Sequence, residues 1–111
     1  MIGRVWHGWT ARANGDAYEA LLRSTIFPGI LAKRIAGFRR IELLRRDVDE
    51  PGQGPETEFV TIMWFDSLDA IKAFAGKDWD VAVVPEAARA VLKRFDARSQ
   101  HYEVCETREA E

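Results

Sequence analysis

Hydrophobic and polar positions along the chain follow a pattern that predicts strands and helices in alternation. The clearest strand is Thr57–Asp66, and a second covers Ile2–Thr10, because both runs are rich in β-branched and aromatic residues. After the first strand, Asn14 is a suitable helix cap and the apolar residues that follow it recur at helical spacing. This spacing predicts an amphipathic helix over residues 14–28, which Pro28-Gly29 is expected to end.

The remainder of the chain continues this alternation, with proline and glycine at the boundaries. The predicted elements are a strand over 38–47, a loop over 49–56, the strand over 57–66, a helix over 68–75 between a Ser67 cap and Gly76, a helix from Pro85 to about Phe95, and a strand over 99–107. The order is that of a ferredoxin-like βαββαβ α+β fold. Right-handed crossovers then give one antiparallel four-stranded sheet, in the order 4-1-3-2, with both helices on one face.

Apolar side chains point to both faces of this sheet, whereas the helices can cover only one. In the third strand, Phe59 and Met63 alternate with the outward-facing residues, and in the first strand Val5 and Trp9 alternate with Trp6. The residues assigned to the uncovered face are Trp6, Val60, Ile62 and Trp64. Exposed together they would form an apolar patch on the order of several hundred Å². We therefore expect a second copy to cover it in a two-fold homodimer, the alternative being tolerated surface residues.

Length and composition limit the class of protein. A chain of 111 residues allows one domain, which we place at residues 1–107 with a charged tail at 108–111. A single cysteine, Cys105, forms no internal disulfide, and the sequence contains no signal-like or membrane-spanning apolar run. These features predict a cytoplasmic protein without a membrane partner. The net charge of −2 also argues against a nucleic-acid partner.

Several motifs resemble those of the antibiotic biosynthesis monooxygenase-like family of dimeric α+β barrels, over nearly the whole chain. They are Pro28-Gly29, Gly37-Phe38, and the run from Trp64 to Ala70 followed by Phe74. The resemblance implies ferredoxin-like subunits that pair into a dimeric α+β barrel, with a small-molecule cavity between helices and sheet in each subunit. It says less about activity, because the family includes quinol-forming oxygenases, haem-degrading enzymes and members of no known role.

The resemblance also implies which residues meet the ligand. Phe59 and Met63 are expected in the core beside the cavity, and the substrate-binding candidates are Trp9, Tyr18, Phe65, Phe74, Trp79 and His101. His7 is the candidate catalytic residue, since an imidazole could take a phenolic proton and leave a carbanion-like substrate that reacts with O₂. A buried, hydrogen-bonded histidine is the alternative interpretation, and ordinary core is the alternative for each aromatic residue.

The sequence lacks the residues that haem degradation or metal binding would require. The haem-degrading branch needs a histidine in the region of Val83-Val84, and none occurs between Trp64 and His101. Two histidines without a carboxylate or cysteine pattern make no metal site, so we expect neither a metal nor another cofactor. Six of the sixteen basic residues lie between positions 33 and 46, either as an anion site at the cavity mouth or as charge that protects an edge strand.

The sequence therefore predicts a homodimeric, cofactor-independent monooxygenase-like protein acting on a hydrophobic aromatic or phenolic small molecule. The alternative is a non-catalytic dimeric barrel that binds a small ligand. An RNA-binding module of the same topology is excluded, because the third strand lacks the required glycines and basic start.

Overall fold

One antiparallel sheet runs through the molecule, and the computed structural model describes all residues, 1–111. Its strands are β1 (Ile2–Ala11), β2 (Phe38–Glu50), β3 (Gly54–Phe65), β4 (Arg94–Phe95) and β5 (Gln100–Glu103). They are ordered β2-β3-β1-β4, and β5 also pairs with β1. Both β4 and β5 pair with β1 along the edge opposite to β3, so together they form one interrupted edge strand. The predicted 4-1-3-2 order and the ferredoxin-like fold are confirmed.

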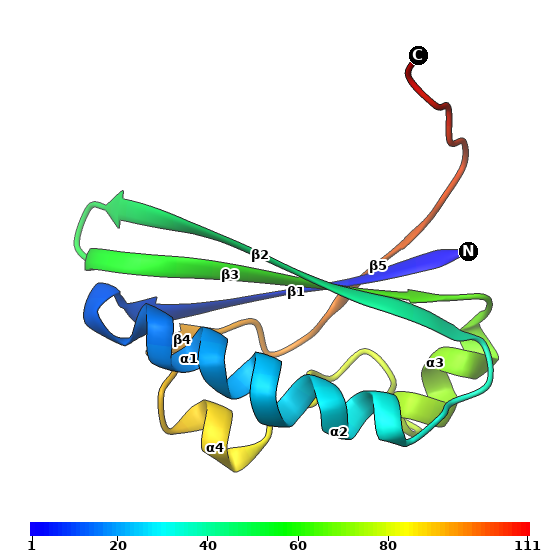
Figure 1. Ribbon diagram of the computed structural model, residues 1–111, viewed down its shortest axis with the longest axis horizontal. Helices are drawn as coiled ribbons and strands as arrows, with labels where there is room; N and C mark the ends of the chain where they lie inside the picture. The colour runs from blue at the N-terminus through cyan, green and yellow to red at the C-terminus, as the bar shows by residue number, and fades with distance from the viewer.

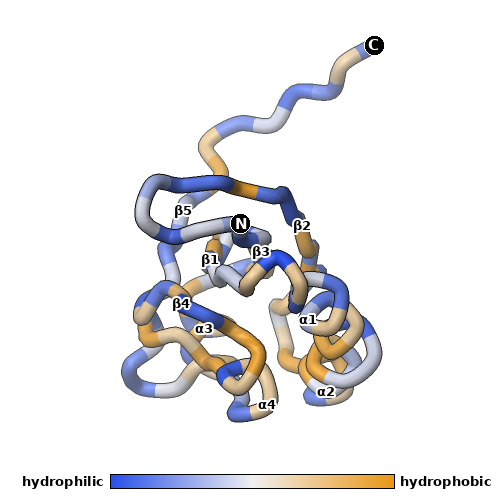
Figure 2. Tube along the Cα trace, turned by 90° about the vertical axis from the view of Figure 1, so that its left-hand side faces the viewer, coloured by the Kyte–Doolittle hydropathy of each residue, from blue (hydrophilic) through white to orange (hydrophobic).

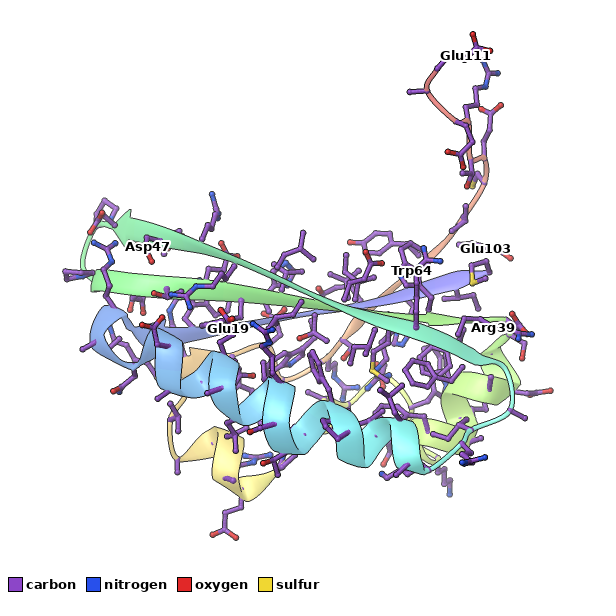
Figure 3. The ribbon with its side chains drawn as sticks, viewed as in Figure 1. Glu19, Arg39, Asp47, Trp64, Glu103 and Glu111 are labelled. Atoms are coloured by element: carbon purple, nitrogen blue, oxygen red, sulfur yellow. The ribbon has the colours of Figure 1, made fainter.

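The helices all lie on one side of this sheet, as Figure 1 shows. They are α1 (Gly15–Leu21), α2 (Phe27–Ala32), α3 (Leu68–Ala75) and the single-turn α4 (Glu86–Arg89), with a 3₁₀ turn at Arg12–Asn14 before α1. The other side of the sheet is bare. The C-terminal segment leaves the body on that bare side and ends at Glu111, far from the sheet (Figure 3).

The first helix is longer than predicted, because Pro28 does not end it. A π-helical turn at Leu22–Ile26 joins α1 to α2, and Pro28 sits in the first turn of α2. Proline lacks an N–H and crowds the carbonyl four residues earlier, but the wider π turn removes the need for that bond. The helix continues to Ala32, after which Arg34 takes a positive φ of 49°. Asn14 precedes α1 as predicted, without a side-chain capping bond.

The loop predicted at 49–56 is mostly strand. The β2 and β3 strands extend to Glu50 and Gly54, which leaves a tight turn at Pro51-Gly52-Gln53. Gly52 and Gly54 have φ values of 82° and 74°, and this left-handed backbone lets the hairpin close in few residues.

The second half of the chain confirms one helix and corrects another. Ser67 caps α3 by accepting from the Ala70 amide at 3.2 Å, and Gly76 follows its end with a φ of 86°. The helix predicted from Pro85 to Phe95 is wrong beyond Arg89. Its last residues turn toward β1 instead, where the Lys93 amide donates to the Trp9 carbonyl at 2.8 Å.

The last strand ends at Glu103 rather than at Thr107. The Val104 amide donates to the Met1 carbonyl at 2.9 Å, just after the end of β5. The chain outside regular structure therefore begins at Val104.

The core lies between the helices and the sheet in two clusters. One contains Tyr18, Leu22, Phe59 and Ala88, and the other contains Met63, Phe65, Ala70 and Ile71. Phe59 and Met63 are thus core residues, as predicted.

The two faces of β1 are the reverse of those predicted. Val5 pairs with Ile62 and His7 with Val60, and directly paired residues of an antiparallel sheet point to the same side. Val5, His7 and Trp9 therefore lie on the bare face, whereas Arg4 and Trp6 lie under the helices.

This reversal corrects two placements: Trp6 is not on the uncovered face, and His7 and Trp9 are not beside the helices. Because β1 carries apolar residues on both sides, its hydrophobic pattern does not fix its phase, and a one-residue slip exchanges the faces. Gly8 favours the observed phase. A Cβ at Gly8 would lie 2.9 Å from the Trp6 ring and 3.0 Å from Leu92, so a glycine fits between them.

Candidate functional site

A cavity lies between the helices and the covered face of the sheet. It holds about 70 Å³ of space that a water molecule can reach. Seen end-on in Figure 2, the α1–α2 helix lies on one side beneath the sheet, and α3 and α4 lie on the other. Apolar side chains from both groups and from the sheet line the cavity: Trp6, Tyr18, Leu22, Ile26, Phe27, Ile30, Ile41, Met63, Phe74, Val83, Val84, Pro85 and Ala88.

The π turn explains how one helix supplies so much of this lining. Tyr18, Leu22, Ile26 and Ile30 all line the cavity at intervals of four residues. In a straight α-helix, twelve residues at 100° each would turn the last of them about 120° away from the first. The π turn at Leu22–Ile26 holds more residues per turn and takes up part of this drift.

Three residues that line the cavity carry hydroxyl groups, and none of the three hydroxyls has a hydrogen-bond partner in the chain. Tyr18 is 1% exposed and its ring meets the Phe59 ring edge-on, with centroids 4.8 Å apart. Burial raises the pKa of the Tyr18 hydroxyl far above its ordinary value of 10.0, so it stays protonated and can donate. Thr61 and Ser99 carry the other two hydroxyls.

Arg4 is the charged residue of the cavity wall, and it is 3% exposed. Its guanidinium donates to the carbonyls of Trp79 and Val81, the latter at 3.2 Å, and lies 3.0 Å from Nε2 of His101. The guanidinium carbon lies 5.6 Å from the centre of the Phe74 ring. Burial lowers the pKa of Arg4 to about 10, an effect that the charge of Asp80 partly offsets, so Arg4 remains charged at neutral pH.

His101 and Trp79 flank Arg4 outside the cavity lining. Their rings meet edge-on with centroids 4.8 Å apart. Because a guanidinium has no acceptor, His101 Nε2 must accept and Nδ1 must carry the proton. Burial, followed by the charge of Arg4, lowers the pKa of His101 below its ordinary value of 6.5, which favours this neutral form.

The predicted ligand residues thus fall in three places. Tyr18 and Phe74 line the cavity, and Trp79 and His101 stand next to it. Phe65 is fully buried between Phe38 and Phe74, with ring centroids at 5.2 and 6.0 Å.

His7 and Trp9 lie across the sheet from the cavity. The His7 Nδ1 atom lies 2.7 Å from an Asp96 carboxylate oxygen, and the His7 ring stacks on Trp9 at 6.0 Å. Trp9 in turn lies under the guanidinium of Arg94, 4.0 Å away, and its buried Nε1 has no partner. None of these groups can touch a ligand in the cavity.

Sequence reasoning missed Arg4 and Trp6 as cavity residues. The signal that could have identified them is that Arg4 and Trp6 are two residues apart in β1 and therefore point to the same face of the sheet. Arg4 pairs with the core residue Met63 and Trp6 with Thr61 on the same face, so the correct phase would have placed both on the face that the helices cover.

The bare face carries an apolar surface that we call the open-face patch, formed by Val5, Leu44, Val60, Ile62 and Trp64. Leu44 is 49% exposed, and the other four side chains are partly exposed. Three of the predicted interface residues therefore share this surface.

Charges around the open-face patch are paired. Arg40 lies 4.9 Å from the Trp64 ring centre, and Glu42 accepts from the Trp64 indole. The basic residues of the edge strand β2 are also paired: Arg39 with Asp66, Arg45 with Asp16 and Glu19, and Arg46 with Glu58. This arrangement favours the edge-strand interpretation of the basic cluster.

Comparison with solved structures matches the chain to the crystal structure of a Bacillus cereus protein described as a candidate antibiotic biosynthesis monooxygenase. The match covers 99% of this chain and 96% of that chain, with a TM-score of 0.61 and 16% identity. The two chains share a fold. At this identity the likeness establishes the fold that the motifs predicted, and the reaction must be argued from the site. No protein-family model matches the sequence, and no curated protein matches it.

Two further observations concern metals and membranes. No group of three or more His, Cys, Asp or Glu side chains is arranged to hold a metal ion. None of the helices is long and apolar enough to cross a bilayer.

Proposed function

We propose that the chain forms a homodimer and acts as a cofactor-independent monooxygenase on a small aromatic or phenolic molecule held in the cavity. The observation that carries this proposal is the unpartnered Tyr18 hydroxyl in a pocket that is otherwise mostly apolar and aromatic. Such a pocket, with few polar groups, is typical of small-molecule sites. The shared fold with a candidate monooxygenase supports the reaction class.

The substrate itself would carry the chemistry. A carbon acid next to a phenolic ring, once deprotonated, can pass electrons to O₂ and form a hydroperoxide. Loss of water then leaves a carbonyl group, so that R₂CH₂ and O₂ give R₂C=O and H₂O. Tyr18 would donate a hydrogen bond to the substrate oxygen and fix the ring, while the apolar walls exclude water.

The proton acceptor differs from the one predicted. His7 lies across the sheet, and neither an imidazole nor a carboxylate lines the cavity. The substrate must therefore be acidic enough to lose its proton to water at the cavity mouth. This requirement favours hydroxylated aromatic molecules.

The homodimer is supported by the open-face patch. Five apolar side chains lie together on a face that no helix covers. A second copy packed sheet against sheet would bury both patches and give the two-fold barrel that the sequence predicted.

Oxygen uptake tests the function. Wild-type protein should consume O₂ with one or more members of a panel of single-ring phenols that carry an activated CH₂ group next to the ring. Tyr18→Phe should lower kcat/KM about fivefold, because one neutral hydrogen bond is lost. Tyr102→Phe is the matched control, since Tyr102 is 61% exposed and pairs with Gly3 on the opposite face.

Two results would change the assignment. Binding of these molecules without any oxygen uptake would assign the chain to a non-catalytic ligand-binding barrel, which the missing imidazole in the cavity favours. An absence of both binding and oxygen uptake would contradict the proposed function.

A further inference from the structure

We infer that the cavity selects an aromatic oxyanion, a ring carrying a carboxylate or phenolate group, and that Arg4 is the residue that binds this group. The inference rests on the proposed function in one respect, namely that the ligand occupies the same cavity. It goes further in naming the charge of the ligand and the residue that binds the charged group.

Arg4 is a buried cation without a counter-ion. No carboxylate lies within ion-pair distance of it, and its contacts are two carbonyl groups, an imidazole and an aromatic ring. Asp80, whose charge acts on Arg4, is itself bound by Arg98 at 2.8 Å. An unpaired charge in an apolar setting is costly, and an anion at the cavity end of Arg4 would relieve this cost.

Other partly buried arginines of the chain differ from Arg4 in this respect. Arg94 donates to Glu56 at 2.9 Å, and Arg45 donates to Glu19 at 2.9 Å. The chain therefore supplies carboxylates where an arginine has a structural role. At Arg4, in the wall of the cavity, it supplies none.

The guanidinium has donors to spare. Of its five N–H groups, Nη1 serves the Trp79 carbonyl and His101, and Nη2 serves the Val81 carbonyl with one hydrogen. Nε and the second hydrogen of Nη2 have no acceptor in the chain. Neighbouring N–H groups of this kind bind both oxygens of a carboxylate in parallel, or a phenolate oxygen between them.

The neighbours of Arg4 hold this group in position. His101 is fixed as a neutral acceptor, and the Phe74 ring stands 5.6 Å from the guanidinium. Both are positioning residues in this scheme. The apolar walls around Tyr18 would then take the aromatic ring of the ligand, whose oxyanion points to Arg4.

A pair of ligands of nearly equal shape tests the inference. NMR titration, followed at the Tyr18 and Ala88 amides, would compare benzoate with benzamide. Wild-type protein should bind benzoate about tenfold or more tightly than benzamide, because a charge-assisted bidentate contact is available to benzoate alone. Arg4→Met should remove this preference and leave benzamide binding within about twofold.

Controls separate ligand binding from a structural role. Arg98→Met removes a nearby positive charge that pairs with Asp80 but does not line the cavity, so the preference for benzoate should remain. Arg4→Lys keeps the charge and loses the planar fork, and it should show an intermediate preference. If Arg4→Met fails to fold, because Arg4 also holds the Trp79 and Val81 carbonyls, the lysine variant decides.

The outcomes distinguish the two proposals. Equal binding of benzoate and benzamide to the wild type, or an unchanged preference in Arg4→Met and Arg4→Lys, would overturn the inference while leaving a ligand-binding cavity. Failure of the wild type to bind either molecule, together with no oxygen uptake from phenolic substrates, would overturn both.

Discussion

Both faces of the sheet carry apolar side chains, but the two sets lie in opposite environments. Within β3, Phe59 and Phe65 are fully buried, whereas Val60 and Ile62 on the same strand are partly exposed. The side-chain types do not account for this difference. The helices of one chain cover one face only, so a cover for the other face must come from outside the chain.

The two faces also differ in whether their charged side chains form ion pairs. On the bare face, Arg46 pairs with Glu58 and Arg94 with Glu56, so the polar border of the open-face patch is satisfied within the chain. On the covered face, Arg4 is buried without a carboxylate. Paired charges around an apolar patch are typical of a protein interface, whereas an unpaired buried cation in a cavity wall indicates a small ligand.

The largest expected effect is a difference in the free energy of unfolding between substitutions at two adjacent residues of β3. Phe59→Ala should lower the free energy of unfolding by about 3–5 kcal/mol, because it empties a fully buried site. Val60→Ala should cost about 1 kcal/mol or less in dilute protein, where its face is uncovered. Urea denaturation at micromolar protein concentration measures both, and equal losses would contradict the division into two faces.

A second prediction breaks the open-face patch. Trp64→Glu should raise the dissociation constant of the proposed homodimer by at least about 100-fold, because two-fold symmetry would place an unpaired charge at the interface twice. Sedimentation equilibrium measures the change. Leu31→Glu is the control, since Leu31 is 53% exposed on α2, and this variant should remain dimeric. A dimeric Trp64→Glu protein would place the interface elsewhere.

A third prediction concerns the paired charges of the bare face. The hydrogen bond from Arg94, followed by that from Lys93, holds the pKa of Glu56 below its ordinary value of 4.5. As pH falls below 4.5 the unfolded chain binds more protons than the folded one, so the stability from Glu56 is lost in acid. Glu56→Gln should therefore flatten the fall in stability below pH 4.5. Glu103→Gln, which removes a carboxylate without an ion pair, should leave that fall unchanged.

The smallest effect concerns the covered face. In Arg4→Met, the pKa of His101 should move up toward 6.5 but stay below it, because burial, the larger cause of its lowering, remains. Since the lowered pKa makes the folded state lose stability as pH falls below 6.5, the variant should lose less in that range. NMR titration of the imidazole measures the pKa, and an unchanged value would mean that the charge of Arg4 does not reach the ring.

The sequence predicted the fold well because its strongest signals are local. The Ser67 cap, Gly76 and the strand alternation of β3 each act within a few residues, and all three appear as predicted. The errors arose where contacts between residues far apart in the sequence determine the structure. The phase of β1 depends on its pairing with β3, and the end of the last helix depends on hydrogen bonds that Lys93 makes to β1.

The candidate site suffered most from the error in β1. Shifting the phase by one residue exchanged His7 and Trp9 for Arg4 and Trp6 in the cavity wall. An arginine near the start of a strand is ordinarily solvent-exposed, and no local pattern marks Arg4 as buried. By contrast Tyr18 and Phe74, which were proposed from the family resemblance, both lie in the cavity wall.

The π turn at Leu22–Ile26 has a consequence for the changes of length that this helix can accept. Removing one residue there would leave a regular helix with Ile30 eleven positions after Tyr18, a rotation of about 20° beyond three full turns. Both side chains would therefore still face the cavity. Homologous chains that lack one residue in this turn should therefore keep the same cavity wall on a straight α-helix, and should accept ligands of similar shape.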